Sequence, residues 1–494
     1  MRALLLALTM ATAPAAAQQP SPELVAKNRA AAEAMNAGRF DEAAGLYREL
    51  LAAVPGEPGL LMNLGMALAM GGHEAEAIQP LEKAVAMRPS LLPAQMFLGT
   101  SYLALGQPEK AIPPLERVVA AQPKDLEARR VLAQALAGAG RLAAAVTQLR
   151  RATEIAPKEP ATWYALGHGY NAITQEAMAT FDAEPADSPW RQLLVADALM
   201  ADGRLTDAFT LYRRTLEALP RMVSIHDSIA KIYEQTGHKD WAETERQKGK
   251  LTPAQCAARK ALCEFRAGRY RPALVAALNG TDPESRYWRA RAGTELALQA
   301  FNQLESLPDS RERREARAQL ARAQRRHVDS VVELEAALKF APGDPMLLEE
   351  LAYSQYLARN YEASIDIARP LVDKAPDNAR LLTIYGDALL QLQRIDEALP
   401  VLRRAHTLTP DDPLTRAALG RALVSTGDFA GAIPLLESQL AEDVDGSLHI
   451  QLARAYTGLG QKDKATPLLE RAQAIQRDQQ EKGAAAGEHE ITPP

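Results

Sequence analysis

The chain has 494 residues, of which 47% are hydrophobic and 24% charged, and its formal net charge at pH 7 is −5. Its length alone would accommodate several domains, while its mild acidity argues against nucleic acid as a general partner. Aromatic residues make up only 5% of the chain, and no segment shows the alternation of apolar and polar side chains typical of a strand. The composition therefore favours a helical protein.

The first 17 residues have the pattern of a secretory signal peptide. Arg2 supplies a positive start, an apolar run follows from Ala3 to Ala13, and Ala15 to Ala17 form a small-residue cleavage site. The run is too short to cross a bilayer, and no cysteine lies near the cleavage site to carry a lipid. We predict an exported protein, periplasmic or secreted, with a linker at residues 18–23. The alternative is that residues 1–17 are an ordinary first helix.

A period of 34 residues dominates the rest of the chain. Proline marks it at Pro55, Pro89, Pro123 and Pro157, and again at Pro342, Pro376 and Pro410. A small residue lies twelve positions before each proline and another twelve positions earlier, so each repeat holds two helices in close contact. Glycine-containing turns separate the two helices, and the proline ends the second one. The pattern predicts a linear stack of helical hairpins.

These residues resemble the tetratricopeptide repeat family. Trp163 to Gly167 followed by Tyr170 matches the first-helix signature of that family. A nearly complete repeat is formed by Leu98, Gly99, Tyr102, Glu109, Lys110, Ala111 and Pro123. The resemblance extends over residues 24–479. It implies an all-α fold, an α-α superhelical solenoid, which binds other proteins or peptide segments along a concave groove.

The 34-residue phase is lost between residues 160 and 309. After Tyr170 the second helix of the repeat looks short and ends at Pro185, and a similar irregular unit runs from Tyr287 to Pro308. We interpret both as truncated hairpins that kink the solenoid. The chain is then divided into a signal peptide (1–17), a linker (18–23), an N-terminal array with a truncated last unit (24–188), an irregular section with both cysteines (189–309), a C-terminal array (310–479) and a disordered tail (480–494).

Cys256 and Cys263 are the only cysteines of the chain, and export would place them where disulfides form. On one unbroken helix they would lie about 10.5 Å apart along the axis, whereas a disulfide requires Cα atoms within about 7 Å. A bond therefore requires the helix to begin after Cys256. The alternative is that both are small core residues. No further ligand pair accompanies them, which disfavours a zinc site.

The sequence gives no support for catalysis. Its eight histidines are spread along the chain, and none has a second histidine four residues away or belongs to a recognisable triad. A glycine pair around His168 has no strand before it and is too weak to indicate a nucleotide site. We predict no catalytic residue, no metal and no cofactor.

The resemblance implies that the first helices of successive repeats line the groove. In the N-terminal array this predicts an apolar, methionine-rich zone formed by Asn28, Met35, Met62, Met66, Met70 and Met96. Flexible thioethers suit a surface that accepts varied apolar ligands, although methionine also fills gaps between helices. In the C-terminal array the predicted zone is polar and of mixed charge, with Tyr353, Arg380, Asp387, Arg421 and Arg454.

An arginine cluster begins the C-terminal array. Its members are Arg311, Arg313, Arg314, Arg317, Arg322, Arg325 and Arg326. On a helix they leave Ala316, Leu320 and Ala323 as the buried stripe, and the cluster is either a contact for an anionic partner or a solvated face. The sequence as a whole indicates a non-catalytic interaction scaffold or adaptor of the cell envelope. The alternative is a periplasmic helical subunit of a polysaccharide or protein export or assembly machine.

Overall fold

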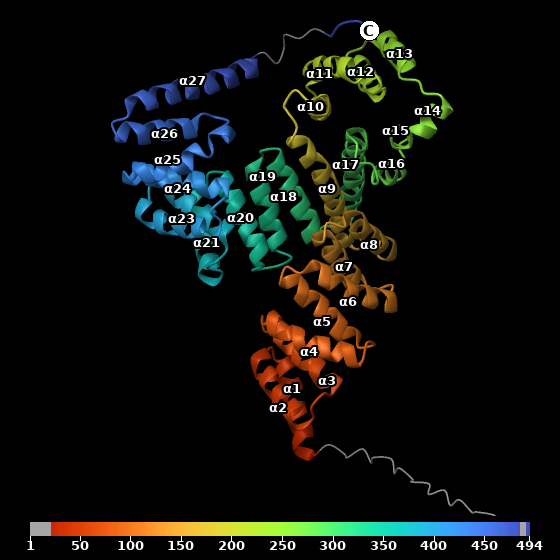
Figure 1. The fold of residues 1–494 in the computed structure, drawn as a ribbon, viewed down its shortest axis with the longest axis vertical. Coiled ribbons are helices and arrows are strands. Elements are labelled where there is room, and N and C mark those ends of the chain that lie inside the picture. The colour runs from red at the N-terminus through yellow and green to blue at the C-terminus, as the bar shows by residue number, and fades with distance from the viewer. Residues whose placement is uncertain (1–20, 485–490) are drawn as a thin grey trace, which may run out of the picture. The chain divides into compact units, whose positions relative to one another are not determined.

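The computed structural model describes residues 21–484 and 491–494, and Figure 1 shows that these residues form helices connected by short turns. Across the described residues there are 27 α-helices, one short 3-10 helix and no β-strand. The predicted all-α fold is confirmed. In this part of the chain no helix combines the length and the apolar character needed to cross a membrane. The predicted signal peptide lies outside the described residues.

The helices belong to two compact units, one ending at Pro157 and the other beginning at Lys158. In the first unit, consecutive helices pair as four hairpins. Its helices are α1 (Pro22–Asn36), α2 (Phe40–Ala53), α3 (Pro58–Met70), α4 (Glu74–Met87), α5 (Leu92–Ala104), α6 (Pro108–Ala121), α7 (Leu126–Gly138) and α8 (Leu142–Ile155). Each second helix ends two residues before one of the periodic prolines, as the sequence predicts.

Glycine and leucine close these hairpins at one repeated contact. A Cβ atom at Gly65 would lie 2.4 Å from Cγ of Leu81, and a Cβ atom at Gly99 would lie 2.5 Å from Cγ of Leu115. Both leucines are completely buried. Because interiors are close-packed, the second helix can approach this closely only where the first helix carries no side chain. The small-residue positions of the sequence repeat are therefore the points of helix contact.

The second unit contains the remaining helices. They are α9 (Pro160–Asp182), α10 (Pro189–Ala201), α11 (Leu205–Ala218), α12 (Ser224–Gln235), α13 (Lys239–Lys248), α14 (Pro253–Ala258), α15 (Lys260–Arg266), α16 (Tyr270–Ala277), α17 (Pro283–Glu305), α18 (Arg311–Ala323), α19 (His327–Leu338), α20 (Pro345–Leu357), α21 (Tyr361–Lys374), α22 (Ala379–Gln391), α23 (Ile395–Leu408), α24 (Pro413–Thr426), α25 (Phe429–Glu437), the 3-10 helix η1 (Leu440–Glu442), α26 (Ser447–Gly458) and α27 (Lys462–Ala484).

The two segments that we interpreted as truncated hairpins are single helices. Both α9 and α17 run unbroken for 23 residues, and they pack along each other. A Cβ atom at Gly167 of α9 would lie 2.6 Å from Cζ of Phe301, and one at Gly293 of α17 would lie 2.4 Å from Oγ1 of Thr174. The truncated-hairpin interpretation is wrong, because the partner of each helix lies far away in the sequence. Residues 183–282 are an insertion between the two helices of one pair.

The insertion has a core of its own, built largely from aromatic side chains. Phe209, Tyr212 and Tyr233 are buried there together with Trp288 from the first half of α17. From Ala290 onward α17 contacts α9, so this one helix joins the insertion to the repeat. In contrast to the hairpins of the first unit, the insertion depends on large rings in close contact.

The two cysteines are bonded to each other in the structure. Cys256 lies in α14 and Cys263 in α15, with their Cα atoms 5.6 Å apart. The helix is interrupted between them at Arg259, whose φ and ψ are −122° and 54°. This interruption supplies the change of direction that a single helix would not allow.

From α18 onward the helices again pair in sequence order. The contacts Gly386–Leu402 and Gly420–Leu436 repeat the tight approach of the first unit. Residues 480–494 were predicted to be a disordered tail, and two described parts of this segment differ from that prediction. Helix α27 continues to Ala484, and Ile491 packs against the core of the insertion.

Candidate interaction surfaces

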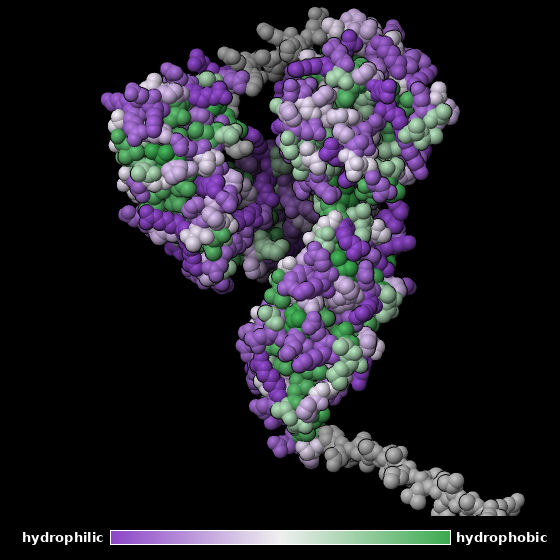
Figure 2. All heavy atoms as spheres, viewed as in Figure 1, coloured by the Kyte–Doolittle hydropathy of each residue, from purple (hydrophilic) through white to green (hydrophobic). Residues whose placement is uncertain are grey.

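Figure 2 shows that hydrophobic residues reach the displayed face in separate groups between hydrophilic ones. The structure places every predicted residue of the methionine-rich zone on α1, α3 or α5 with its side chain half-buried or exposed: Asn28, Met35, Met62, Met66, Met70 and Met96. A cavity of about 420 Å³ in the same unit is lined by Leu61, Leu64 and Leu68 together with residues of α2 and α4, and not by the methionines. The methionine zone stays a prediction.

Four of the five residues of the predicted polar zone form contacts between helices of the protein. Arg380 pairs with Glu349 at 3.1 Å and with Glu350 at 2.8 Å. Its guanidinium lies 5.1 Å from the ring centre of Tyr353, and that of Arg322 lies 5.5 Å from the same ring. Burial opposes ionisation of Glu350, but hydrogen bonds from Arg322 and Arg380 outweigh it and lower the pKa of this carboxyl. Both arginines therefore form ion pairs with carboxylates of a neighbouring helix.

Two other residues of the polar zone are likewise engaged. Asp387 is buried, accepts a hydrogen bond from the Tyr356 hydroxyl and pairs with Arg421 at 2.8 Å. Arg454 is exposed and lines a separate cavity of about 470 Å³ formed by α24, α25, α26 and α27. The structure thus brings Tyr353 into contact with Arg380, and Asp387 into contact with Arg421. Arg454 lies apart from both pairs.

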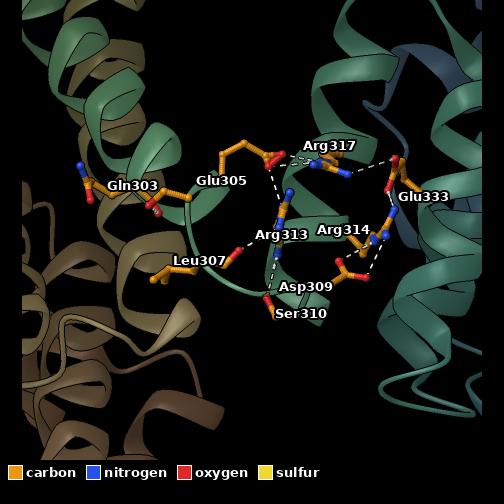
Figure 3. Close-up of polar contacts among 10 residues, drawn as sticks. Gln303, Glu305, Leu307, Asp309, Ser310, Arg313, Arg314, Arg317 and Glu333 are labelled. Atoms are coloured by element: carbon orange, nitrogen blue, oxygen red, sulfur yellow. Dashed lines mark hydrogen bonds and ion pairs between the residues drawn. The ribbon is translucent and has the colours of Figure 1, made fainter.

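Carboxylates also pair with the arginine cluster of α18, as Figure 3 shows. Glu305, at the end of α17, pairs with Arg313 at 2.8 Å and also with Arg317. Arg314 pairs with Asp309 at 2.7 Å and with Glu333 of α19 at 2.8 Å. The pKa of Glu305 is lowered, because the hydrogen bonds from Arg317 and Arg313 outweigh the opposing effect of burial.

Of the seven arginines of the cluster, six have such an ion pair within the described residues: Arg311, Arg313, Arg314, Arg317, Arg322 and Arg326. Pairing of this kind leaves little uncompensated charge to attract an anion. The cluster instead connects α18 to α17, α19 and α20, and this pairing does not support the predicted anionic partner.

An apolar groove lies beside this cluster, between α17 and α18. Its cavity has a volume of about 470 Å³, and Ala297, Phe301 and Leu304 are among the residues that line it. Leu298 and Leu320, on opposite sides, are 54% and 55% exposed. Exposed leucines facing an apolar hollow are typical of a surface that binds an apolar segment.

The sequence prediction for this helix face was wrong. Ala316, Leu320 and Ala323, predicted as the buried stripe of α18, line the groove, and the completely covered residues are Ala318 and Ala321. The error arises because α18 packs on one side against α19 and on the other against α9. The signal that pointed to the groove was the apolar character of the stripe, which we assigned to the core.

A polar cavity of about 380 Å³ lies between the insertion and α17. Arg266 pairs with Asp227 at its rim at 2.7 Å, and Phe265 and Tyr270 form part of its wall. Tyr287 also lines the cavity, and the hydroxyls of Tyr212 and Tyr287 donate to Asp197. Burial raises the pKa of both tyrosines, so that they remain neutral donors. These two hydrogen bonds connect α10, α11 and α17.

In the described part of the chain, three histidines form pairs with carboxylates. His226 contacts Glu245 at 2.6 Å, His449 contacts Asp443 at 2.6 Å, and His73 contacts Asp41 at 2.9 Å. Within residues 21–484 and 491–494, no group of three or more His, Cys, Asp and Glu side chains is placed to hold a metal ion. These pairs are isolated from one another and form no recognisable catalytic arrangement.

Comparison with known families identifies the repeats. Three family models described as tetratricopeptide repeat match the chain. The first matches residues 28–91, 98–160 and 349–413, the second matches residues 389–449, and the third matches residues 447–479. Together they cover about half of the chain. The chain is a tetratricopeptide repeat protein. The unmatched residues between 160 and 349 include the whole insertion.

Curated relatives share only short stretches with this tetratricopeptide repeat protein. The Vi polysaccharide export protein VexE of Salmonella typhi is 35% identical over 85 residues, 17% of this chain and 13% of its own length. The cellulose synthase 2 operon protein C of Komagataeibacter xylinus is 32% identical over 162 residues, 31% of this chain and 12% of its own length. The chain thus matches about an eighth of each relative.

Similar repeats also occur in a protein of different description and in solved structures. The cell division cycle protein 27 homolog A of Arabidopsis thaliana is 34% identical over 92 residues, 18% of this chain and 13% of its own length. MamA of Desulfovibrio magneticus is 26% identical, with a TM-score of 0.30 over 31% of this chain and 85% of that one. A thermophilic repeat protein of Thermus thermophilus is 21% identical, with a TM-score of 0.30 over 36% and 98%.

Proposed function

We propose that this protein is a non-catalytic interaction scaffold of the cell envelope that holds apolar segments of partner proteins. The apolar groove between α17 and α18 is the observation that carries the proposal, because Leu298 and Leu320 are more than half exposed on either side of it. Repeat proteins of this type bind protein segments along their helices. The paired charges at its edge would fix the direction of a bound segment more than its affinity.

The groove is tested by in-cell crosslinking. A photo-crosslinking amino acid is placed at position 320 and, as a control, at position 414, where a leucine of α24 is 65% exposed. We expect crosslinked partners at position 320, and their loss when Leu298→Glu is added. Equal yields at both positions, or crosslinks that survive Leu298→Glu, would contradict the groove.

The same experiment separates the two envelope functions. The alternative, a periplasmic helical subunit of a polysaccharide or protein export or assembly machine, is favoured by the names of two relatives, an export protein and a cellulose synthase operon protein. One dominant envelope complex in the crosslinked material would support the machine subunit. Many unrelated partners would support an adaptor.

The methionine zone provides a second test of capture. Met62, Met66 and Met96 are half-buried, so replacing all three with glutamate puts charge on that surface without opening a large cavity. We expect partner capture to fall while the helical circular dichroism signal is retained. Unchanged capture would show that the methionines only fill gaps between helices.

Export itself is tested by the mass of the amino terminus. In a bacterial host we expect the mature protein to begin at Gln18, after Ala17. Recovery of an uncleaved chain from the cytoplasmic fraction would contradict localisation in the envelope.

A further inference from the structure

The segment Ile491–Pro494 lies against the insertion. Ile491 is partly buried and packs against the aromatic core of α11 and α12. It lines a cavity of about 360 Å³ together with the residues around Gly203, in the turn between α10 and α11, and with Thr236 at the end of α12. Two successive hairpins of the insertion therefore contribute to the surface that receives this one side chain.

A buried tyrosine holds the backbone of the same segment. The hydroxyl of Tyr233 donates to the carbonyl oxygen of Thr492 at 2.6 Å, and the tyrosine side chain is completely buried. Its ring is fixed between Phe209 and Trp241, with ring centres 5.6 and 5.5 Å away. Burial raises the pKa of Tyr233, so the hydroxyl keeps its proton. A buried hydroxyl deprived of its acceptor is costly, which makes the carbonyl a required part of the contact.

The chemistry of the segment suits this surface. Thr492 precedes Pro493, which biases its backbone toward an extended conformation. Pro493 and Pro494 have no N–H groups that need acceptors, and their fixed φ angles reduce the entropy lost on binding. Gly203, which has a φ of +76° and no atom within 4 Å of its absent Cβ, lines the same cavity as Ile491. The segment therefore binds through one apolar side chain and one carbonyl oxygen.

We propose that the surface formed by the α10–α11 turn and the end of α12 is a binding site for extended peptides of the pattern Ile-Thr-Pro. Residues 491–494 of the chain occupy it. A partner segment with the same pattern must displace them, and a tethered competitor acts at an effective concentration in the millimolar range. The site is separate from the α17–α18 groove, so it can be tested without assuming the scaffold function.

The full-length chain carrying Ile491→Asp tests occupancy. We expect hydrogen exchange of the amides near Gly203 and Thr236 to rise about tenfold, because the covering side chain leaves the cavity. The control is Leu414→Asp, the same chemical change at an exposed position of α24, which should leave these amides unchanged. Identical exchange in the wild type and in Ile491→Asp would overturn the proposal.

Binding in trans is measured with a fluorescent peptide of residues 487–494. The Ile491→Asp chain should bind it at least about tenfold more tightly than the wild type, whose own segment competes. Adding Tyr233→Phe, which keeps the ring and removes the donor, should weaken peptide binding about threefold or more. A scrambled peptide that binds equally well, or a Tyr233→Phe chain with unchanged affinity, would also overturn the proposal.

Discussion

The regular hairpins and the insertion of this tetratricopeptide repeat protein are both helical but are held together differently. In the hairpins a glycine receives a buried leucine, as at Gly65 and Leu81, and the same contact returns after 34 residues. In the insertion, aromatic rings meet around Tyr233 and Trp288 without a repeat. A repeated contact can be recognised from local spacing, whereas the insertion core needs residues from α10 to α17 at once.

The largest expected effect follows from truncating the ring that α17 contributes to the insertion. Trp288 is 2% exposed, and Trp288→Ala should destabilise the insertion by about 3–5 kcal/mol because it leaves a large cavity. Hydrogen exchange should rise in α10–α16 and in α17. Repeat arrays couple mainly through neighbouring units, so α22–α25 should keep its protection. A uniform rise along the whole chain would show that the insertion is not a separate cooperative region.

Removing the disulfide tests how much this bond stabilises the short helix α14 of the insertion. No residue of α14 is buried, so little besides the Cys256–Cys263 bond holds it. The double change Cys256→Ser and Cys263→Ser should cost about 2–4 kcal/mol, chiefly by freeing the unfolded chain. The loss should appear as faster hydrogen exchange in α14 and α15, with α3 and α4 as an internal reference. Equal exchange with and without the bond would indicate that packing alone fixes α14.

Two glycines compare the α9–α17 contact with open helix surface. Gly293→Ala places a Cβ atom 2.4 Å from Oγ1 of Thr174 and 3.3 Å from the carbonyl oxygen of Tyr170, and should destabilise by about 1–3 kcal/mol through overpacking. Gly45→Ala is the matched control, since nothing lies within 4 Å of that position. In α2 it should stabilise by about 0.5–1 kcal/mol. Urea denaturation measures both, and equal effects would contradict a tight α9–α17 contact.

The same difference explains what the sequence could predict. The 34-residue period places the proline-terminated helices and their small-residue contacts correctly. It could not show that α9 pairs with α17, because both look like incomplete hairpins when read locally. The interruption at Arg259, which lets Cys256 approach Cys263, likewise carries no glycine or proline to announce it.

The surfaces were harder to predict than the repeats. Helical periodicity alone does not say which side of α18 faces a neighbour, and Leu320 was therefore assigned to the core although it is 55% exposed. The partners of the arginine cluster include Glu305 at the end of α17, Glu333 of α19 and Glu350 of α20. Their proximity is a property of the folded chain. Charge on a single helix was a poor guide to charge on the surface.

The smallest expected effect is the loss of stability when a buried carboxylate of the insertion is replaced, and an exposed carboxylate of the first hairpin serves for comparison. Glu245 is 1% exposed and lies 2.6 Å from His226 and 2.8 Å from Lys248. Burial raises its pKa, but the hydrogen bonds from Lys248 and His226 outweigh burial and lower it. The unfolded value for glutamate is about 4.3. A lowered folded pKa means that the stabilisation is present above this value and is lost as the pH falls through the folded pKa.

Glu245→Gln should therefore destabilise the insertion at neutral pH by about 1 kcal/mol, the typical net contribution of one hydrogen bond, because the amide oxygen of glutamine can still accept one. The difference from the wild type should shrink as the pH is lowered below about 4. Glu33→Gln is the control, because Glu33 and its partner Arg29 are 64% and 83% exposed and such pairs contribute little. Thermal unfolding between pH 3 and pH 7 measures both variants. A Glu245→Gln difference that stays constant over this range would mean that shape, and not ionisation, makes this carboxylate matter to the insertion.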